Sequence, residues 1–492
     1  MRSMDINLKL TISFLLPSAF MSLAVLYGAA CGGTQQPSSI PTSTPSMTEI
    51  QPSPIHTPTP SSMKQPVAPT TPTTFTTPIS YDAFPNNLRS AFKAAVDSEF
   101  TAIKEKSGIS VAVYTDGTLW TYATGEANVT VPMTANTPMF ISSMSKTFLS
   151  ALILIQLESG LYKITDSLGA VLSNHPDFPS FDPAKINPEV TIQELLTMSS
   201  GLPEYSENKN GIGEIFKQPS WQPSDKINLV QSQFIEPGSF KYNDTNSALL
   251  GLIAQHYSGQ TLADLYRQTF YNPLGMQAIT LPEEGIAWHR NILYDKAEQF
   301  TVPDIAFPYG DLTRWSSGFG NIIQAAPFEF GYYIVGQGRI RWACCEIVST
   351  AESIARWTYE LYRSNGSAIS ESARSRLIDS FSADRVPPWN RPKTIPEEYG
   401  YFVAKKVFQL SNERIVTAYG HRGGGGGYSS WMYYSPELDL SISILTNSDE
   451  KHGPTGGGFN CTFENPGSCI TLLIFDSFSS NLPSTSQQPY KP

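Results

Sequence analysis

The stretch Phe140-Ile-Ser-Ser-Met-Ser-Lys-Thr-Phe148 holds a Ser-x-x-Lys motif between two apolar segments. The motif is unspecific by itself, and it occurs five times, beginning at Ser61, Ser90, Ser143, Ser206 and Ser448. Only Ser143 follows an apolar pair and precedes a long apolar run, which stops at Gly160 and predicts a buried helix. Lys146 then lies one helical turn from Ser143, where a buried lysine can accept the serine proton. Taken alone, the motif favours an ordinary helix-capping serine with a lysine that extends to solvent; Ser143 as a nucleophile with Lys146 as its acid/base partner is the alternative that the rest of the chain must support.

Strand patterns lie near both ends of the chain, with helical patterns between them. Residues 109–113 alternate in hydrophobicity and lead into an Asp-Gly turn at 116–117, which predicts a hairpin. A second hairpin is predicted by residues 428–434 and 440–445 around a Ser-Pro turn. We expect an α/β fold of the α+β type, in which an antiparallel sheet built from both ends is flanked by helices and joined by a mostly helical subdomain.

The composition separates a folded part from an extended N-terminal part. The chain has 492 residues and a net charge of −10, without a run of Lys or Arg, which argues against a nucleic-acid partner. From Gly32 to about Pro78 it consists mainly of Pro, Thr and Ser, which cannot form a core. We predict a targeting segment at 1–30, a disordered tether at 31–82, a folded domain at 83–480 and a flexible tail at 481–492.

The N-terminal segment has the features of an export signal. Arg2 and Lys9 precede an apolar run that ends in small residues and Cys31, a pattern similar to the lipobox of bacterial lipoproteins. We therefore expect an exported cell-envelope lipoprotein, facing the extracytoplasmic side and held to the membrane by a lipid on Cys31. An uncleaved membrane anchor is the alternative, because the run is long enough to span a bilayer. Residues before Cys31 retained in the mature protein would contradict the lipoprotein prediction.

The other cysteines suggest one disulfide and no metal site. Cys461 and Cys469 flank a short Pro-Gly loop, and a bridge between them is expected in an oxidising compartment. Cys344 and Cys345 are adjacent, and two buried thiols are a better interpretation than a strained vicinal disulfide. The six histidines are scattered and H-E-x-x-H is absent, so no metal or other cofactor is predicted.

From residue 86 to 480 the chain resembles the class C β-lactamases, D-Ala-D-Ala carboxypeptidases and related esterases. The segment 140–148 is similar to the nucleophile motif of this family, and 192–205 to its second helix and the following loop. The segment 240–251 resembles the Tyr-x-Asn region, and 420–424 occupies the place of the Lys-Thr-Gly strand. Further landmarks in the same order are the segments 273–276 and 348–357.

This resemblance implies a β-lactamase/DD-peptidase-like fold and a serine hydrolase that acts on amide or ester bonds. Ser143 would form an acyl-enzyme with a small-molecule or peptide substrate, and Tyr242, as a phenolate or a proton relay, would assist it. Backbone N–H groups of Ser143 and of the strand after His421 would form the oxyanion hole. Gly423 and Gly424 would let the substrate approach that strand closely. The oligomeric state is not predicted.

Two substrate-binding positions depart from the family. Asp244 replaces the usual Asn, so it cannot donate a hydrogen bond, and its charge would hold a proton on Lys146 and shift the role of base toward Tyr242. His421 replaces the usual Lys, and with an ordinary pKa it would make activity depend on pH. Arg422 should face away from it, because successive strand residues point to opposite faces.

These departures favour a carboxypeptidase or an esterase over a true β-lactamase, which remains the alternative. A non-catalytic penicillin-binding sensor is the third possibility, and turnover of a chromogenic ester would distinguish it from the enzymes.

Overall fold

The computed structural model describes residues 79–81, 83–100, 107–128, 131–217, 221–281, 305–306, 336–387, 397–448 and 465–482. All of them belong to one unit of the chain, residues 64–492. The predicted targeting segment, Cys31 and most of the predicted tether lie outside the described residues, as do Cys461 and the tail beyond residue 482.

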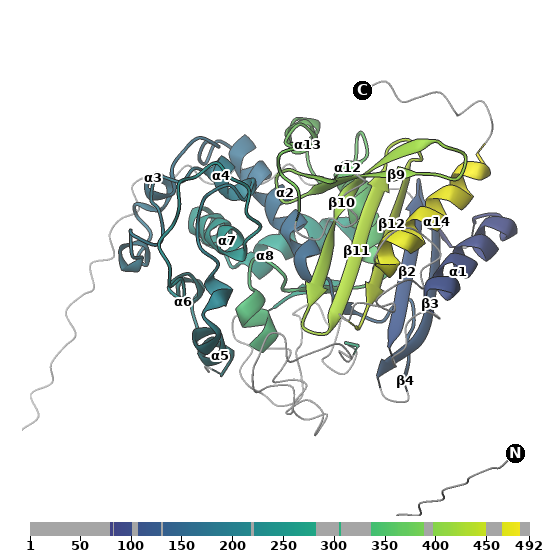
Figure 1. The fold of residues 1–492 in the computed structure, drawn as a ribbon, viewed down its shortest axis with the longest axis horizontal. Helices are drawn as coiled ribbons and strands as arrows, with labels where there is room; N and C mark the ends of the chain where they lie inside the picture. The colour runs from purple at the N-terminus through teal and green to yellow at the C-terminus, as the bar shows by residue number, and fades with distance from the viewer. Residues whose placement is uncertain are drawn as a thin grey trace, which may run out of the picture. The chain divides into compact units, whose positions relative to one another are not determined.

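A nine-stranded sheet combines strands from both ends of the folded chain (Figure 1). Its order is β1-β3-β2-β12-β11-β10-β9-β8, with β4 paired to β3, and only the β1–β3 pairing is parallel among the described strands. Val111 of β2 lies opposite Ile444 of β12, which confirms a mostly antiparallel sheet assembled from the two ends. The strands are β1 Ser80–Tyr81, β2 Gly108–Thr115, β3 Thr118–Asn128, β4 Val131–Pro132, β8 Glu397–Tyr399, β9 Ala404–Gln409, β10 Ile415–Gly425, β11 Tyr428–Ser435 and β12 Leu440–Thr446.

Both predicted hairpins are present in this sheet. The turn between β2 and β3 has positive φ at Asp116 (33°) and Gly117 (82°), as two-residue hairpin turns require. The ordered sheet begins earlier than expected, since Ser80 lies inside the predicted tether but donates its N–H to Gly117 O at 2.8 Å. A second, three-stranded sheet lies off this path and comprises β5 Met139–Phe140, β7 Ile347–Ser349 and β6 Ala278–Thr280.

Helices cover both faces of the large sheet, and the alternation along β2 explains the two layers. Val111 and Val113 join one core cluster with helices α1 (Asn86–Phe100) and α14 (Pro466–Ser480). Ala112 and Tyr114 point to the other face, into the larger cluster that contains α2 (Ser145–Glu158) and α12 (Ala351–Tyr362). Figure 1 shows α1 and α14 side by side on one face.

The mostly helical region between the two sets of strands contains a predicted capped helix. In α4 (Ile192–Leu196), Thr191 Oγ1 accepts from Glu194 N at 3.2 Å, and the Glu194 carboxylate accepts from Thr191 N at 2.8 Å. The other helices are α3 Leu168–Leu172, α5 Lys209–Lys217, α6 Pro223–Ile227, α7 Asp244–Ser258, α8 Leu262–Tyr266, α9 Asn272–Leu274 and α13 Glu371–Ile378. Among the described residues, no helix combines the length and apolar character needed to cross a bilayer.

Candidate active site

Ser143 lies in a tight turn at the entrance of the buried helix α2. The turn is the 3-10 segment Ser142–Met144, and α2 begins at Ser145. Ser142 has φ of 50°, a left-handed conformation that costs free energy for a residue with a side chain. Distant segments hold this turn: Ser430 Oγ donates to Ile141 O at 2.6 Å, and Ile347 N donates to Ser145 Oγ at 3.2 Å. Ser143 is therefore presented on a rigid support.

Lys146 is fully buried and contacts Ser143 directly. Its Nζ donates to Ser143 Oγ at 3.2 Å and to Cys344 O at 3.2 Å, and it forms an ion pair with Asp244 at 2.7 Å. Burial lowers the pKa of Lys146, but the charges of Asp244 and Cys345 outweigh burial and raise this pKa well above its ordinary value. Lys146 is thus an ammonium ion at neutral pH. The initial expectation that Lys146 itself accepts the serine proton is therefore wrong for the resting site.

Asp244 is the carboxylate that holds the proton on Lys146. It opens helix α7, which Asn243 caps by accepting from Thr245 N at 2.8 Å. Burial raises the pKa of Asp244, but the charge and the hydrogen bond of Lys146 lower this pKa by a larger amount, so the net shift is downward. Glu204 accepts from Asp244 N at 2.6 Å, and burial together with the charge of Asp244 raises the pKa of Glu204. The ion pair predicted from the Asn-to-Asp departure is present.

The aromatic ring of Tyr242 packs against the Lys146 ammonium group. Lys146 Nζ lies 5.2 Å from the centre of its ring, and the Tyr242 hydroxyl interacts with the Ser143 hydroxyl. Burial raises the pKa of Tyr242 well above its ordinary value, and the nearby Lys146 charge opposes only part of this shift. Tyr242 is therefore a neutral phenol in the resting site, suited to relaying a proton, and the phenolate alternative does not describe this state.

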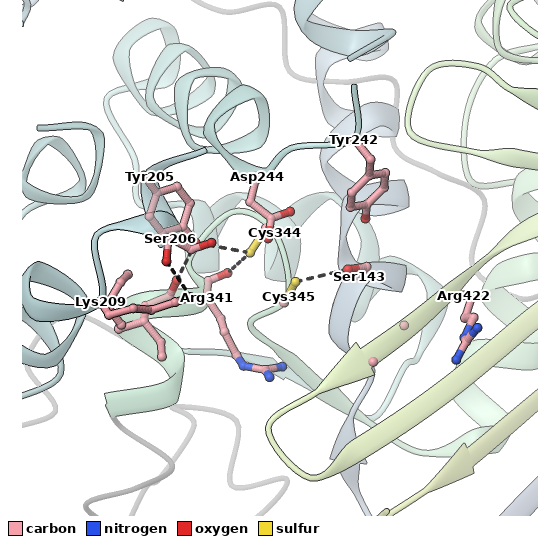
Figure 2. A pocket seen from close by; sticks show the side chains of 14 residues that line it. Ser143, Tyr205, Ser206, Lys209, Tyr242, Asp244, Arg341, Cys344, Cys345 and Arg422 are labelled. Carbon is pink, nitrogen blue, oxygen red and sulfur yellow. Dashed lines mark hydrogen bonds between the residues drawn. The ribbon is translucent and has the colours of Figure 1, made fainter. Parts of the chain in front are cut away.

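Ser143 opens onto a cavity of about 510 Å³. Figure 2 shows the cavity with β10 along one side. A Cβ on Gly423 would lie 2.4 Å from Ile141 O and 2.9 Å from Ser142 Cβ, so the glycine lets β10 approach the nucleophile turn. The lining residues are Ser143, Tyr205, Ser206, Lys209, Ile212, Tyr242, Asp244, Ile340, Arg341, Cys344, Cys345, Arg422, Gly423 and Gly424.

His421 differs from the expectation in its burial and in its pKa. It is fully buried, its Nδ1–H donates to Arg422 O at 2.6 Å, and its Nε2 accepts from Tyr399 Oη at 3.0 Å. Burial, and secondarily the Lys146 charge, lower the pKa of His421 to about 3. The expectation of an ordinary pKa and of a pH response near neutrality is wrong, because no water reaches the ring. His421 supports Tyr399 beneath the site and is absent from the described cavity lining.

Arg422 follows the strand alternation. It borders the cavity, but its guanidinium carbon lies 5.7 Å from the centre of the Trp431 ring, which belongs to the core cluster of α1 and α14. Arg422 thus contacts Trp431 and also borders the cavity, so the expectation that it faces away from a substrate stays a prediction.

Cys344 and Cys345 are free and buried, as predicted, and they lie beside the nucleophile. Cys345 Sγ is 3.4 Å from Ser143 Oγ and 3.6 Å from Lys146 Nζ. Together with Asp244, the two thiols place three potential metal-binding atoms within 4.8 Å of one another. Asp244 already pairs with the Lys146 ammonium ion, so we assign no metal to this group. Cys469 takes part in a disulfide, and its predicted partner Cys461 lies outside the described residues.

The sequence carries no motif for several residues that line the cavity. Arg341 donates from Nη1 to Ser142 Oγ at 3.3 Å and from Nε to Gln337 at 2.6 Å, which places a guanidinium next to the nucleophile turn. Ser206 and Lys209, another Ser-x-x-Lys pair, line the same cavity. Lys209 is exposed and donates to the Ser206 carbonyl at 2.8 Å, whereas Lys146 is buried and donates to the Ser143 hydroxyl at 3.2 Å.

The fold and this group of side chains define a serine hydrolase of the penicillin-recognising class. A family model described as Beta-lactamase matches residues 95–457, and the chain belongs to that family. Penicillin-binding protein 4 of Amycolatopsis lactamdurans is 24% identical over 69% of this chain and 80% of its own length. Penicillin-binding protein 4* of Bacillus subtilis (strain 168) is 25% identical over 71% of each chain. The predicted family and the predicted enzyme class are confirmed.

Solved structures have the same fold. D-amino acid amidase from Ochrobactrum anthropi SV3, complexed with D-phenylalanine, aligns with a TM-score of 0.60 at 18% identity and covers 80% of this chain and 100% of the amidase. A β-lactamase/D-alanine carboxypeptidase from Yersinia pestis, complexed with citrate, aligns with a TM-score of 0.55 at 16% identity, over 80% of this chain and 98% of the other. These likenesses confirm the predicted fold class.

Proposed function

We propose that this serine hydrolase cleaves amides or peptides of D-amino acids through an acyl-enzyme on Ser143. The observation that carries the proposal is the position of Ser143 Oγ, 3.2 Å from the buried Lys146 Nζ, at a cavity of about 510 Å³. A nucleophile, a fixed positive charge and a phenol meet at this point, as acyl transfer requires.

Each side chain of the site has its own role in the proposed acyl transfer. Ser143 Oγ attacks the substrate carbonyl, and its proton passes to the oxygen of Tyr242, whose hydroxyl interacts with it, while the neutral Tyr242 phenol gives its own proton to the leaving-group atom. The Lys146 ammonium ion stabilises the negative charge that develops on the oxygens, and Asp244 keeps it charged. We assign the oxyanion hole to the backbone N–H groups of Ser143 and of the β10 strand at Gly424. The protonated leaving group departs, Tyr242 is again a neutral phenol, and water repeats the relay on the acyl-enzyme, with Tyr242 passing a proton back to Ser143 Oγ.

The substrate class rests on the named relatives and on the charges in the cavity. The structural neighbours include a D-amino acid amidase, and a putative D-alanyl-D-alanine carboxypeptidase of Escherichia coli O157:H7 is 29% identical over 30% of this chain. Arg341 and Lys209 line the cavity and supply positive charge that the neutral His421 does not. Relative kcat/KM values for a D-amino acid amide, a D-Ala-D-Ala peptide, a neutral ester and a cephalosporin test this assignment, and a preference for the cephalosporin would contradict it.

Covalent labelling tests the role of Ser143. We expect a fluorophosphonate to add to Ser143 in the wild type, and we expect Ser143→Ala to lose the adduct and at least a thousandfold in kcat/KM. Ser206→Ala is the matched control, because Ser206 lines the same cavity in another Ser-x-x-Lys motif, whose lysine is exposed and donates to the Ser206 carbonyl. Mass spectrometry of both variants gives the answer. An adduct that persists in Ser143→Ala, or that disappears in Ser206→Ala, would refute the assignment.

A further inference from the structure

The proposed mechanism leaves one nucleophilic side chain of the cavity unused. Cys345 lines the cavity with its Sγ 3.4 Å from Ser143 Oγ and 3.6 Å from Lys146 Nζ (Figure 2). Its backbone is fixed, since Cys345 N donates to Arg341 O at 2.9 Å and to Glu346 Oε2 at 2.8 Å. The thiol is therefore held toward the space that a substrate enters.

The surroundings favour the thiolate of Cys345. Burial opposes ionisation, but a hydrogen bond from the Cys344 thiol and the positive charge of Lys146 outweigh it, and together they lower the pKa of Cys345 to about 6. Arg341 adds positive charge, and Asp244 opposes it. The thiolate is the form of cysteine that reacts with electrophiles, and reactive cysteines typically lie beside lysine or arginine.

Cys344 provides an internal comparison one residue away. Its Sγ lies 3.0 Å from Arg341 O, and burial followed by the hydrogen bond that its thiol gives to Cys345 raises the pKa of Cys344 well above its ordinary value. Cys344 therefore stays a thiol. Two adjacent, buried cysteines thus differ in the property that controls reactivity, and the more acidic one lies beside the nucleophile.

We propose that Cys345 is a second nucleophile of the catalytic cavity, a modification site that exchanges with low-molecular-weight disulfides. The Sγ thiolate attacks one sulfur of R–S–S–R, a Cys345–S–S–R bond forms, the original S–S bond breaks, and RS⁻ leaves. A free thiol reverses the step. A group attached 3.4 Å from Ser143 Oγ occupies the space that the substrate carbonyl needs, so the mixed disulfide blocks acylation of Ser143.

The test uses the whole folded protein and 2,2′-dithiodipyridine as the small disulfide, with peptide mapping by mass spectrometry. We expect an adduct on Cys345 that forms at least tenfold faster than any adduct on Cys344. We also expect the modified protein to lose fluorophosphonate labelling of Ser143 and to regain it after a monothiol removes the adduct. Adduct formation without loss of labelling would refute the block.

Three variants separate this inference from the proposed function, on which only the block of acylation rests. Cys344→Ala should still form the adduct, whereas Cys345→Ala should not. Ser143→Ala should also form the adduct, because the exchange does not need the serine. A wild type that shows no hydrolase activity but reacts at Cys345 would refute the proposed function and leave the modification site intact. Because Cys345→Ala could misfold, the wild-type map decides independently: preferential reaction of Cys344, or reaction of both thiols only after unfolding, overturns the proposal.

Discussion

A single carboxylate sets the protonation of the site. Asp244 stands where the family resemblance implies an amide, 2.7 Å from the Nζ of a lysine with no exposed surface. An amide there would leave burial as the strongest influence on Lys146, and burial favours the neutral amine. A carboxylate in place of a side-chain amide at position 244 thus changes Lys146 from a candidate base into a fixed positive charge.

Replacing Asp244 with Asn should reverse this change. In Asp244→Asn the largest influence that raises the pKa of Lys146 is gone, so this pKa should fall and the ammonium ion that the proposed mechanism uses should be lost at lower pH. We expect the descending limb of the profile of kcat/KM against pH, measured with a neutral ester, to move to lower pH, with about a tenfold loss in rate for each pH unit above the new pKa. Glu204→Gln is the matched control, because Glu204 binds the backbone of Asp244 rather than Lys146. Superimposable profiles for wild type and Asp244→Asn would show that Lys146 does not control the rate.

At the scale of elements, the site depends on close contact between strand β10 and the nucleophile turn. The turn contains the strained Ser142, and Ser430 on the neighbouring strand β11 holds it through Ile141 O. Gly423 lies at the point of contact, and its φ is not in the left-handed region, so space rather than backbone freedom requires glycine there.

An alanine scan of two neighbouring glycines tests this contact. A Cβ at Gly423 would meet Ser430 Oγ at 2.3 Å and Ile141 O at 2.4 Å, so β10 would have to move away from the turn. We expect Gly423→Ala to lower the free energy of unfolding by about 2 kcal/mol. At Gly424 no atom lies within 4 Å of the added Cβ, and Gly424→Ala should change the stability by less than about 0.5 kcal/mol. Urea denaturation of both variants is the measurement, and equal losses would mean that the contact does not matter.

At the scale of the whole molecule, burial of titratable groups beside the cavity links stability to pH. The pKa of His421 is lowered to about 3 by burial, so between this value and its unfolded pKa of about 6.5 only the unfolded chain binds the proton. Stability therefore falls as pH decreases through this window. Glu346 has the opposite effect, because burial raises its pKa to about 8, and the folded state then binds the proton that the unfolded carboxylate has lost. Its contribution to stability falls as pH increases from about 4.5 to about 8.

Removing each group should expose the two opposite slopes. As the pH falls from about 6.5 to about 5, we expect the wild type to lose about 1–2 kcal/mol of unfolding free energy through His421, and we expect His421→Gln not to show this loss. Glu346 stabilises the folded state increasingly as the pH falls, and Glu346→Gln should lose this contribution. The unfolding free energy of the wild type should therefore rise relative to that of Glu346→Gln as the pH falls over the same interval. Chemical denaturation of the three proteins at the two pH values tests both signs. A His421→Gln variant with the wild-type dependence on pH would indicate that water reaches the ring in the folded protein.

The sequence by itself determined the architecture and the principal chemistry of this protein. The two hairpins follow from local periodicity and turn residues, whereas the fold family and the role of the Ser-x-x-Lys pair were implied by the resemblance of ordered landmarks to a known family. The exported lipoprotein with Cys31, the bridge from Cys461 to Cys469 and the tether stay predictions, since these positions lie wholly or mostly outside the described residues.

Only the tertiary structure decided the charge states of the site and its further nucleophile. Cys345 is 202 positions from Ser143 in sequence and 3.4 Å from it in space. His421 was expected to titrate near neutrality, but the packing of Tyr399 and the surrounding core excludes water from its ring. A pKa is set by burial and by nearby charges, and here both come from segments that the chain brings together only when it folds.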